Sequence, residues 1–361
     1  MKEGWEYRQF ESCLVKVPKQ VQLKSKEYKT EGKFPIVSQE AELISGYWDD
    51  ETIVYSHKDP VVIFGDHTKN IKYIDFDFVV GADGTHILST KNDINPKFFY
   101  YVLKSIKLRE LGYARHYKLL KEKYIPVPKL SEQQSIVDYL DSAFAKIDAM
   151  KANAEKALNE AKALFQASLK EMLEPKEGWE EKTLKEICRV INGRAYSKDE
   201  MLKQGKYRLL RVGNFFTNDS WFYSDLELEE DKYCDNGDLL YAWSASFGPR
   251  IWDGEKVIYH YHIWKMVCSE KIDKYFMYYW LDSDELKKQT MTNLHGATMA
   301  HITKGIIEAA FVRFPSLSEQ QSIVATLDSL KSKVDRLQEN YDKISQECDA
   351  LKQAILRQVF E

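Results

Sequence analysis

The chain contains the same stretch twice, and this internal repeat constrains its fold more than any other feature. The octapeptide Leu-Ser-Glu-Gln-Gln-Ser-Ile-Val occupies residues 130–137 and returns letter for letter at residues 317–324. The alignment continues without a gap from 128–174 to 315–361, with roughly half of the positions identical. An architecture built from two copies of one structural unit is therefore expected.

A second repeated stretch, Lys-Glu-Gly-Trp-Glu, opens each half of the chain at residues 2–6 and 176–180. Two repeats in consistent order divide the chain into two globular segments that alternate with two repeated tails. The expected boundaries are 1–127 and 175–314 for the globular segments, and 128–174 and 315–361 for the tails.

Both tails are predicted to be long helices. Each begins with a serine followed three residues later by a glutamine, Ser131 and Gln134 in one tail and Ser318 and Gln321 in the other. Such pairs are typical of a capping box, in which the serine oxygen accepts a hydrogen bond from an unpaired amide at the helix start.

The apolar residues of the tails recur at alternating spacings of three and four, which is typical of a coiled-coil seam. The distal tail carries them at Leu327, Leu330, Val334, Leu337, Tyr341, Ile344, Cys348, Leu351 and Ile355. The central tail keeps this pattern with smaller side chains at Leu140, Ala143, Ile147, Met150, Ala154, Ala157, Ala161 and Leu164. We expect the two helices to pair as an antiparallel coiled coil; the alternative is that each packs on its own globular segment.

The globular segments differ almost completely between their shared edges. Runs typical of strands occur at residues 52–55, 61–64, 239–243 and 256–259, and patterns typical of helices at 96–108 and 274–288. This mixture predicts an α+β fold for both segments. A shared frame around divergent contents indicates two recognition modules on one scaffold.

Composition narrows the class of protein. With 361 residues, 44% of them hydrophobic, the chain can build two or three packed domains. The net charge of −4 neither supports nor excludes a nucleic-acid partner, because the acidity lies mostly outside the globular segments. The five cysteines are scattered without a CxxC pair, which argues against a zinc finger and fits a reducing compartment. No signal peptide or long apolar run occurs, so we expect a cytoplasmic protein with no membrane partner.

The second half carries an ordered set of motifs, with Gly-Trp…Leu within 178–184, Gly-Asp-Leu-Leu at 237–240, Gly248, an aromatic-rich stretch at 259–264, and Pro-x-Leu-x-Glu-Gln-x-x-Ile-Val at 315–324. Taken in order, these motifs resemble those of the specificity subunits of type I restriction–modification systems. Because the same ending closes the first half, the resemblance covers the whole chain.

The first half departs from this pattern in its interior, where Lys-Asp-Pro-Val-Val at 58–62 replaces Asn-Gly-Asp-Leu-Leu at 236–240. The resemblance implies that the two segments are target-recognition domains that read different parts of a bipartite double-stranded DNA site. It also implies that two methylation subunits dock on the repeated helical regions to form an adenine-N6 methyltransferase, to which restriction subunits add. The paired helices would then set the gap, since each spans about 65 Å and about 14 base pairs span about 48 Å.

Motifs for catalysis are missing from the sequence. No Pro-Pro pair occurs for the base-holding loop of an adenine methyltransferase, and no phosphate-binding loop occurs for ATP. The stretch Asp-Gly-Glu-Lys at 253–256 ends like a nuclease motif but lacks a partner acid, so we interpret it as a turn. His260 and His262 alternate along an expected strand without further metal ligands, and we expect them to pack or to face DNA. The chain is thus expected to be non-catalytic, with no cofactor and no metal.

The DNA-binding candidates are basic, amide and hydroxyl residues with aromatic neighbours. Lysines favour phosphates, whereas arginine and asparagine can contact base edges. In the first segment they are Lys24, Lys26, Tyr28, Lys69, Asn70, Arg115, His116 and Lys118. In the second they are Arg194, Tyr196, Ser197, Lys198, Arg208, Arg211, Asn214, Ser244, Ser246, Arg250, His301 and Lys304. The candidate partner-binding residues are Glu132, Gln133, Gln134, Glu319, Gln320 and Gln321. Each residue alone could instead be an ordinary solvated surface residue.

Three other functions stay open on the sequence. The first is the specificity subunit of a type II-like restriction–modification system, which is again a binding module. The second is a standalone nuclease built on coiled coils, and the third is a structural adaptor that does not bind DNA. A nuclease assay of the purified chain separates the second, and DNA binding in the presence of the methylase separates the third.

Overall fold

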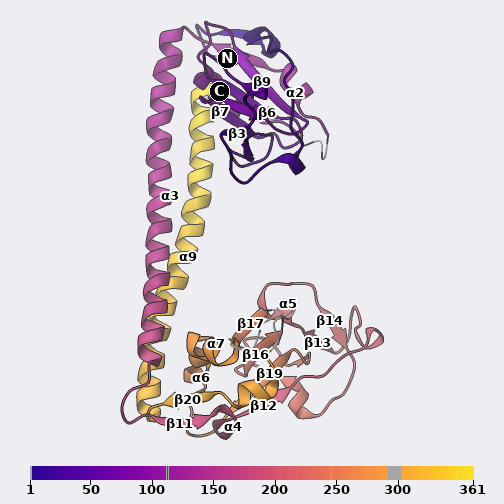
Figure 1. Cartoon of the computed structure of the whole chain (residues 1–361), viewed down its shortest axis with the longest axis vertical. Coiled ribbons are helices and arrows are strands. Elements are labelled where there is room, and N and C mark those ends of the chain that lie inside the picture. The colour runs from indigo at the N-terminus through magenta and orange to yellow at the C-terminus, as the bar shows by residue number, and fades with distance from the viewer. Residues whose placement is uncertain (1, 111, 113, 245, 292–301) are drawn as a thin grey trace. The chain divides into compact units, whose positions relative to one another are not determined.

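The computed structural model describes residues 2–110, 112, 114–244, 246–291 and 302–361. They form two compact units, which we call unit 1 (Met1–Glu155 with Asn340–Glu361) and unit 2 (Lys156–Glu339). Each unit contains one globular segment and parts of two long helices (Figure 1).

Unit 1 holds two four-stranded sheets, of order β2-β9-β6-β7 and β4-β3-β8-β5, and a ribbon formed by β1 and β10. Its strands are β1 (Glu6–Gln9), β2 (Leu14–Val15), β3 (Phe34–Val37), β4 (Gly46–Trp48), β5 (Val54–Tyr55), β6 (Val61–Gly65), β7 (Ile71–Ile74), β8 (Phe78–Val80), β9 (Thr85–Thr90) and β10 (Tyr124–Val127). Its helices within this segment are η1 (Phe10–Cys13), η2 (Ser25–Glu27), η3 (Glu51–Ile53), α1 (Pro96–Ser105) and α2 (Tyr117–Lys121).

Unit 2 holds the corresponding sheets, β12-β19-β16-β17 and β14-β13-β18-β15, and a ribbon formed by β11 and β20. Its strands are β11 (Glu180–Thr183), β12 (Cys188–Asn192), β13 (Tyr207–Leu210), β14 (Phe222–Ser224), β15 (Tyr233–Cys234), β16 (Leu239–Ser244), β17 (Ser246–Ile251), β18 (Val257–Tyr259), β19 (Ile263–Cys268) and β20 (Phe311–Phe314). Its helices within this segment are α4 (Leu184–Ile187), η4 (Lys198–Glu200), α5 (Val212–Phe216), η5 (Glu230–Lys232), α6 (Lys274–Asp282), α7 (Asp284–Met291) and α8 (Lys304–Glu308).

The two segments therefore share one topology despite their different sequences. In both, the second sheet has one parallel pair, β3 with β8 and β13 with β18, among antiparallel ones. Strand β6 begins at Val61 and β16 begins at Leu239, and the two strands hold the same position in their sheets. Residues 58–62 and 236–240 are therefore structurally equivalent although their sequences differ. The predicted α+β class and the internal repeat are confirmed.

Local sequence explains the principal elements. All five residues of β6 are buried, as expected for an uninterrupted apolar run covered on both faces. The side chain of Asn95 accepts hydrogen bonds from the first amides of α1, and Asp273 does the same for α6. The helix predicted over 274–288 is two helices, because α6 ends at Asp282 and α7 starts at Asp284.

The repeated tails form helices α3 (Leu130–Leu173) and α9 (Leu317–Phe360). In unit 1 the first part of α3 contacts the last part of α9, where Lys352 donates a hydrogen bond to Asp148. In unit 2 the last part of α3 contacts the first part of α9, where Lys162 Nζ donates to Gln338 Oε1 at 2.8 Å. Residue numbers rise along one helix as they fall along the other, so the predicted antiparallel pairing is confirmed. Among the described residues, no helix is both long and apolar enough to span a bilayer.

The seam of the helix pair differs in part from the predicted one. The predicted seam residues that are instead exposed are Met150, Ala157, Leu164 and Leu351. Leu158, one position along from Ala157, is only 3% exposed. A straight helix of 3.6 residues per turn drifts away from a 3.5-residue repeat, so the buried face moves by one position. Lys352 takes the place of Leu351, with its aliphatic stem packed and its ammonium group on Asp148.

The predicted capping boxes are wrong. Helices α3 and α9 begin at Leu130 and Leu317, so that Ser131 and Ser318 already lie inside the first turn. The Ser135 hydroxyl donates to the Ser131 carbonyl, as a helical serine does. The start of α3 is fixed by Gln133 instead, and the start of α9 is fixed by Gln320.

In unit 1, Gln133 is fully buried. Its amide nitrogen donates to the carbonyls of Asp93 (3.0 Å) and Pro128 (2.8 Å), and its oxygen accepts from the Asn95 amide at 2.8 Å. One side chain thus ties the start of α3 to the start of α1.

Gln320 makes the same contacts in unit 2 and is also fully buried. Its amide nitrogen donates to the carbonyls of Lys271 (3.0 Å) and Pro315 (2.9 Å), and its oxygen accepts from the Asp273 amide at 2.8 Å. The letter-for-letter repeat in the sequence therefore encodes a repeated main-chain connection, which we call the glutamine latch.

Candidate nucleic-acid interface

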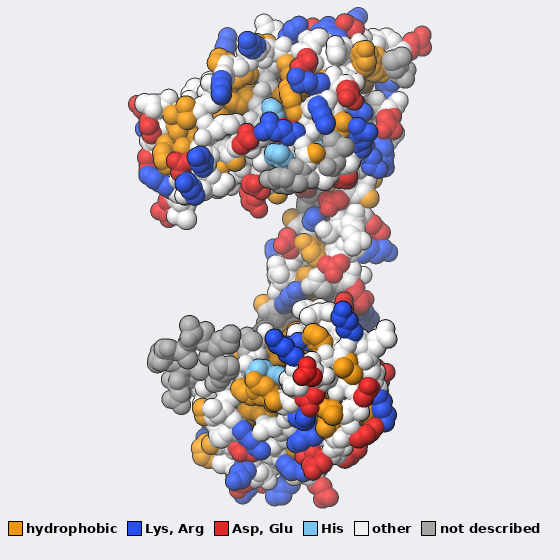
Figure 2. All heavy atoms as spheres, turned by 90° about the vertical axis from the view of Figure 1, so that its right-hand side faces the viewer, with side chains coloured by type: hydrophobic (Ala, Val, Ile, Leu, Met, Phe, Trp, Pro, Cys, Tyr) orange, Lys and Arg blue, Asp and Glu red, His pale blue; other side chains and the backbone are white. Residues whose placement is uncertain are grey.

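Three connections meet at one edge of the globular segment in unit 1: the β6–β7 turn, the β8–β9 turn and the connection between α1 and α2. The backbone of Asp66 joins them, since its amide donates to the Gly84 carbonyl and its carbonyl accepts from the His116 amide, both at 2.8 Å. We call this the loop edge of unit 1. Its counterpart in unit 2 contains the adjoining ends of β16 and β17, at Ser244 and Ser246, and the β18–β19 turn. Figure 2 shows histidine side chains at the surface of both units, with lysine and arginine nearby.

Asp66 is only 2% exposed, and its carboxylate contacts three other residues of the loop edge of unit 1. Its Oδ1 accepts from the Tyr117 amide at 2.7 Å, and its Oδ2 lies 3.3 Å from His86 Nε2 and 3.9 Å from Arg115 Nε. Burial raises the pKa of this carboxyl, but the Tyr117 and His86 contacts outweigh burial and the pKa is lowered. Asp66 is therefore an anion that holds a histidine and an arginine at the surface.

The rings of His86 and Tyr117 stack on each other beside the Asp66 carboxylate. Their ring centroids lie 4.0 Å apart with an interplanar angle of 10°. Arg115 also reaches Asp83 of the β8–β9 turn at 3.2 Å. Sequence reasoning missed Asp66, His86 and Asp83, because nothing local in the sequence links residues so far apart.

The DNA-binding candidates of the first segment fall into three groups. Lys69, Asn70 and Arg115 lie at the loop edge, and Lys69 pairs there with Glu110. His116 is fully buried, and its Nδ1 lies 3.0 Å from the Asp66 carbonyl, so the expected DNA contact of this residue is corrected to a structural one. The remaining candidates flank the edge or lie on α2: Lys24, Lys26, Tyr28 and Lys118.

Lys24, Lys26 and Tyr28 belong to a segment that runs beside the β8–β9 turn. Leu23 forms a parallel bridge with Gly81. A Cβ atom on Gly81 would come within 2.3 Å of the Tyr28 hydroxyl, so Tyr28 packs on the turn. Lys24 and Lys26 are exposed next to it.

The loop edge of unit 2 is built around His260, Tyr261 and His262. The sequence predicted a strand here, but β18 ends at Tyr259 and β19 starts at Ile263, so the three residues form a tight turn. The rings of His260 and His262 are still close, with centroids 4.9 Å apart. Burial, then His262 and Arg211, lower the pKa of His260 to about 4, so its imidazole is neutral at pH 7.

A segment beside this turn carries the strongest candidates of the second half. Arg194 forms a parallel bridge with His260, the counterpart of the bridge between Leu23 and Gly81. The Arg194 guanidinium lies 5.1 Å from the ring of Tyr196 and 2.6 Å from Glu200. Tyr196 is mostly buried and stacks toward His260 at 6.4 Å.

The other candidates of the second half divide by exposure. Arg211, Ser197, Lys198 and Ser246 are exposed. Arg208 is exposed and pairs with Glu255 at 3.2 Å, and Arg250 pairs with Asp253 at 2.9 Å. The half-buried Lys304 begins α8 and lies 3.5 Å from Glu308. His301 lies outside the described residues.

Two candidates are buried and are corrected to structural residues. Asn214 is 8% exposed and its amide nitrogen donates to the carbonyls of Asn218 and Ser220, both at 2.8 Å. Ser244 is 3% exposed at the end of β16. Asn214 thus closes the loop at 218–220.

The stretch 253–256 lies between β17 and β18, as the predicted turn requires. Its acids and its lysine are all paired with oppositely charged side chains: Asp253 with Arg250, Glu255 with Arg208, and Lys256 with Glu230. Within the described part of the chain, no group of three or more His, Cys, Asp or Glu side chains is placed to hold a metal ion.

The partner-binding candidates are split by the glutamine latch. Gln133 and Gln320 are fully buried, so the expectation that they contact a partner is corrected. Glu132, Gln134, Glu319 and Gln321 are exposed. Glu132 accepts a hydrogen bond at 2.8 Å from the indole of Trp5, which belongs to the other repeated stretch.

Structure also reveals matched apolar residues beside these candidates. Tyr124 and Leu130 are 67% and 49% exposed in unit 1. Phe311 and Leu317 occupy the same repeat positions in unit 2 and are 53% and 42% exposed. Large apolar side chains exposed at equivalent positions of both repeats indicate a contact surface that occurs twice.

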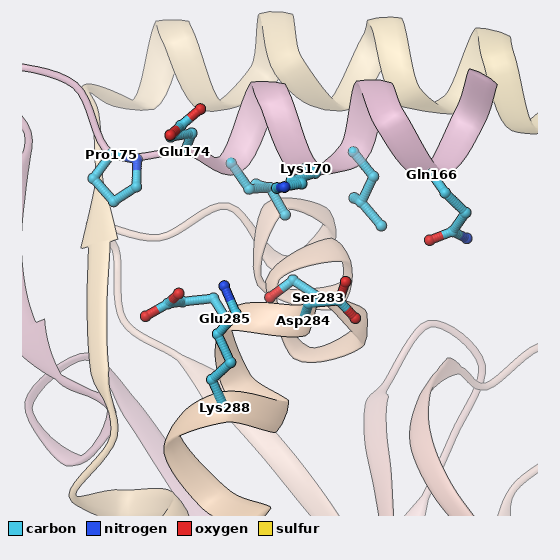
Figure 3. Close-up of a pocket in the computed structure, with 10 residues that line it drawn as sticks. Gln166, Lys170, Glu174, Pro175, Ser283, Asp284, Glu285 and Lys288 are labelled. Carbon is cyan, nitrogen blue, oxygen red and sulfur yellow. The ribbon is translucent and has the colours of Figure 1, made fainter. Parts of the chain in front are cut away.

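A cavity of about 280 Å³ lies in unit 2 between the end of α3 and the start of α7 (Figure 3). Lys170 and Glu174 line it on the α3 side, and Glu285 and Lys288 line it on α7. Charges of both signs line it, and the lining contains none of the DNA-binding candidates among the residues described. The loop edges, rather than this cavity, therefore form the candidate interface.

Comparison with known proteins identifies a matching family model and two similar curated proteins. The family model of the type I restriction modification DNA specificity domain matches residues 2–160 and again 176–346. The MjaVIII specificity subunit of a type I restriction enzyme from Methanocaldococcus jannaschii is 26% identical over 60% of this chain and 57% of its own length. The EcoR124I/EcoR124II specificity subunit from Escherichia coli is 29% identical over 51% of this chain and 48% of its own length. The aligned region thus spans about half the length of these curated relatives.

Solved structures show the same fold. A chain from a study of complex assembly and conformational transition of the type I R-M system aligns over 100% of this chain and 98% of its own, with a TM-score of 0.74 at 19% identity. The HsdS subunit from Thermoanaerobacter tengcongensis aligns over 100% and 97%, with a TM-score of 0.54 at 19% identity.

Proposed function

The chain belongs to the type I restriction–modification DNA specificity family, and we propose that it recognises a bipartite double-stranded DNA site through the loop edges of its two units. One observation carries this proposal: the two segments share a topology but present different side chains at the same edge. Such a pair can read two different half-sites. The chain supplies recognition only; methyl transfer and cleavage, with their cofactors, belong to its partners.

The division of labour follows the repeat. Segments 1–127 and 175–314 act as target-recognition domains, and the helical regions 128–174 and 315–361 join them and receive partners. Arg115 and Arg194 are the best placed for base contacts, because each is held at its loop edge by a carboxylate. The exposed lysines serve as phosphate contacts that position the chain.

Two methylation subunits dock on the twice-repeated surface formed by Tyr124 and Leu130 in unit 1 and by Phe311 and Leu317 in unit 2. Equivalent surfaces suit two copies of one partner. The acidic Glu132 and Glu319 border these surfaces and complement a basic partner. Restriction subunits join through this complex, which acts on adenine N6 in the cytoplasm.

The recognition proposal is tested by purifying the chain with its methylation subunits and mapping methylated adenines in cells that carry both. We expect a two-part motif with a fixed gap, and no methyl transfer from S-adenosylmethionine by the chain alone. A continuous motif, or methyl transfer by the isolated chain, would contradict the proposal.

The docking proposal is tested with Leu130→Asp and Leu317→Asp. Each change alone should leave one methylation subunit bound, and the two together should leave none, as measured by light scattering. Leu164→Asp is the matched control, since Leu164 is 60% exposed on the same helix α3 but away from this surface. A double variant that still binds two subunits would exclude the surface.

A further inference from the structure

One aromatic side chain at the loop edge of unit 2 has no role in the recognition scheme so far. Tyr261 is 38% exposed at the tip of the turn between β18 and β19, while Tyr259 and Ile263 on either side are fully buried. A large ring at the tip of a loop, anchored by buried neighbours, is suited to a contact outside the chain.

The backbone of Gly193 and Arg194 holds the turn that carries Tyr261. The Tyr261 amide donates to the Arg194 carbonyl at 3.0 Å, and the Arg194 amide donates to the Tyr259 carbonyl at 3.1 Å. Gly193 lies so close that a Cβ there would come within 2.4 Å of the Tyr259 and His260 carbonyl oxygens. The position of Tyr261 is therefore set before any ligand binds, which lowers the entropy cost of binding.

Aromatic rings continue from Tyr261 into the core. The Trp243 indole donates to the Tyr261 carbonyl at 2.8 Å, and the two ring centroids lie 6.2 Å apart. Trp243 stacks on the buried Trp264 at 5.4 Å, and Trp264 stacks on Tyr241 at 6.1 Å. The ring of Tyr261 is tilted by 57° to that of Trp243, so Tyr261 lies at the outer end of this stacked column without being covered by a parallel ring from it.

The charges around the tip suit a nucleic acid. His260 lies 4.4 Å from the Tyr261 ring and is neutral at pH 7, since its pKa is lowered to about 4. Arg194 and Arg211 flank the turn, Arg194 through its hydrogen bond and Arg211 next to Leu210, whose carbonyl accepts from His260. Uncharged rings between arginines fit base faces between phosphates.

The loop edge of unit 1 lacks this feature. Its β8–β9 turn is Gly81-Ala82-Asp83-Gly84, with no ring at the tip and with Arg115 paired to Asp83. Within the described residues, a stacking group at this turn is thus a property of unit 2.

We propose that Tyr261 stacks on a base of the second half-site that loses its neighbour when the target adenine turns out of the duplex. This inference rests on the proposed function, because an enzyme that modifies N6 must take adenine out of the helix. Stacking on Tyr261 would stabilise the opened site while the methylation subunit holds the extruded base.

The test uses the full chain in complex with its methylation subunits and a duplex with 2-aminopurine at the target adenine of the second half-site. We expect Tyr261→Ala to lower the extrusion equilibrium of the 2-aminopurine about tenfold, seen as a smaller fluorescence rise. In a matching duplex that keeps the target adenine, the same variant should slow methylation of that adenine by a similar factor. Tyr261→Phe should behave as wild type, since it keeps the ring. Tyr275→Ala is the control, because Tyr275 is 42% exposed on α6 of the same unit.

A duplex with an abasic position opposite the target, where the site is already open, should restore methylation by Tyr261→Ala. If Tyr261→Ala extruded the base as well as wild type does, the stacking role would be overturned and the proposed function would stand. The stacking role would also be overturned if Tyr261→Phe lost as much base extrusion as Tyr261→Ala, because that result would indicate hydrogen bonding by the hydroxyl. A wild-type complex that binds no two-part site would overturn the proposed function, and this inference with it.

Discussion

The loop edges of units 1 and 2 lie on corresponding strands but carry different side chains. In unit 1 a buried carboxylate, Asp66, holds His86 and Arg115, and the turn tip is glycine and aspartate. In unit 2 the tip is a tyrosine between two histidines, backed by stacked tryptophans. The shared topology fixes where the edge lies, whereas the side chains at the edge decide what it can contact. Sequence can therefore diverge at the edge without any change in the scaffold.

Removing the glutamine latch should destabilise either unit to a similar extent. Gln133→Ala and Gln320→Ala each remove a side chain that bonds three main-chain groups, so each should lower the free energy of unfolding of its own unit by about 3 kcal/mol or more. Hydrogen exchange read separately for each unit measures this. Gln134→Ala, an exposed neighbour, should change stability by less than about 0.5 kcal/mol. Equal loss of protection in both units from a single latch variant would contradict the division into two units.

The contact chemistry should respond differently. Arg115→Ala should weaken recognition of the first half-site only, and Arg194→Ala that of the second only, each by about 1–3 kcal/mol if the arginine contacts a base. Binding of the methylation complex to duplexes altered in one half-site measures the effect. Arg336→Ala, an exposed change on α9, is the control. If each variant weakened binding to both half-sites equally, the two loop edges would not recognise separate half-sites.

Acid should affect unit 2 before unit 1. Burial, then His262 and Arg211, lower the pKa of His260 from 6.5 to about 4, so the unfolded chain binds a proton that the folded unit excludes. Unit 2 should therefore lose stability as the pH falls from about 6.5 to about 4. The pKa of Asp66 is lowered from 3.8, so its contribution to unit 1 is lost only at still lower pH. Hydrogen exchange against pH checks this order, and His260→Gln should abolish the step in unit 2.

Lysines should give the smallest and least specific effect. Lys118→Ala in unit 1 and Lys198→Ala in unit 2 remove exposed cations beside the two edges. If each contacts a phosphate, each variant should weaken binding to all sequences alike and reduce the slope of log affinity against log salt by about one. An effect confined to one base sequence would instead indicate a base contact.

The sequence predicted the features that depend on repetition or on period. The repeat gave the two-part organisation, and the apolar spacing gave the antiparallel helices. The period failed at Met150 and Leu351, because the helix drifts from a 3.5-residue repeat and lysine stems can fill a seam. Identical letters also misled: Gln133 and Gln320 are repeated because they hold the fold, not because they face a partner.

The candidate interface was less predictable, because it depends on contacts between distant residues. Asp66 meets His86 and Arg115 only once the turns have come together. His116 is a predicted DNA-binding residue with an aromatic neighbour, Tyr117, yet it is fully buried. In contrast, Arg194 and Lys69 do lie at their loop edges, since arginine and lysine seldom lie fully buried without a partner.

The contact between Lys2 and the end of α9 has a consequence for the connectivity of the chain. Lys2 Nζ donates to the main-chain carbonyls of Gln358, at 3.3 Å, and Val359 in unit 1. Lys176, which is the repeat counterpart of Lys2 in unit 2, follows the end of α3 directly along the chain. A short flexible linker from residue 361 to residue 2 would therefore close the polypeptide into a ring. A circular permutant cut between 174 and 175 should then fold with every strand and helix retained, so the order in which the two readers are synthesised is not dictated by the architecture.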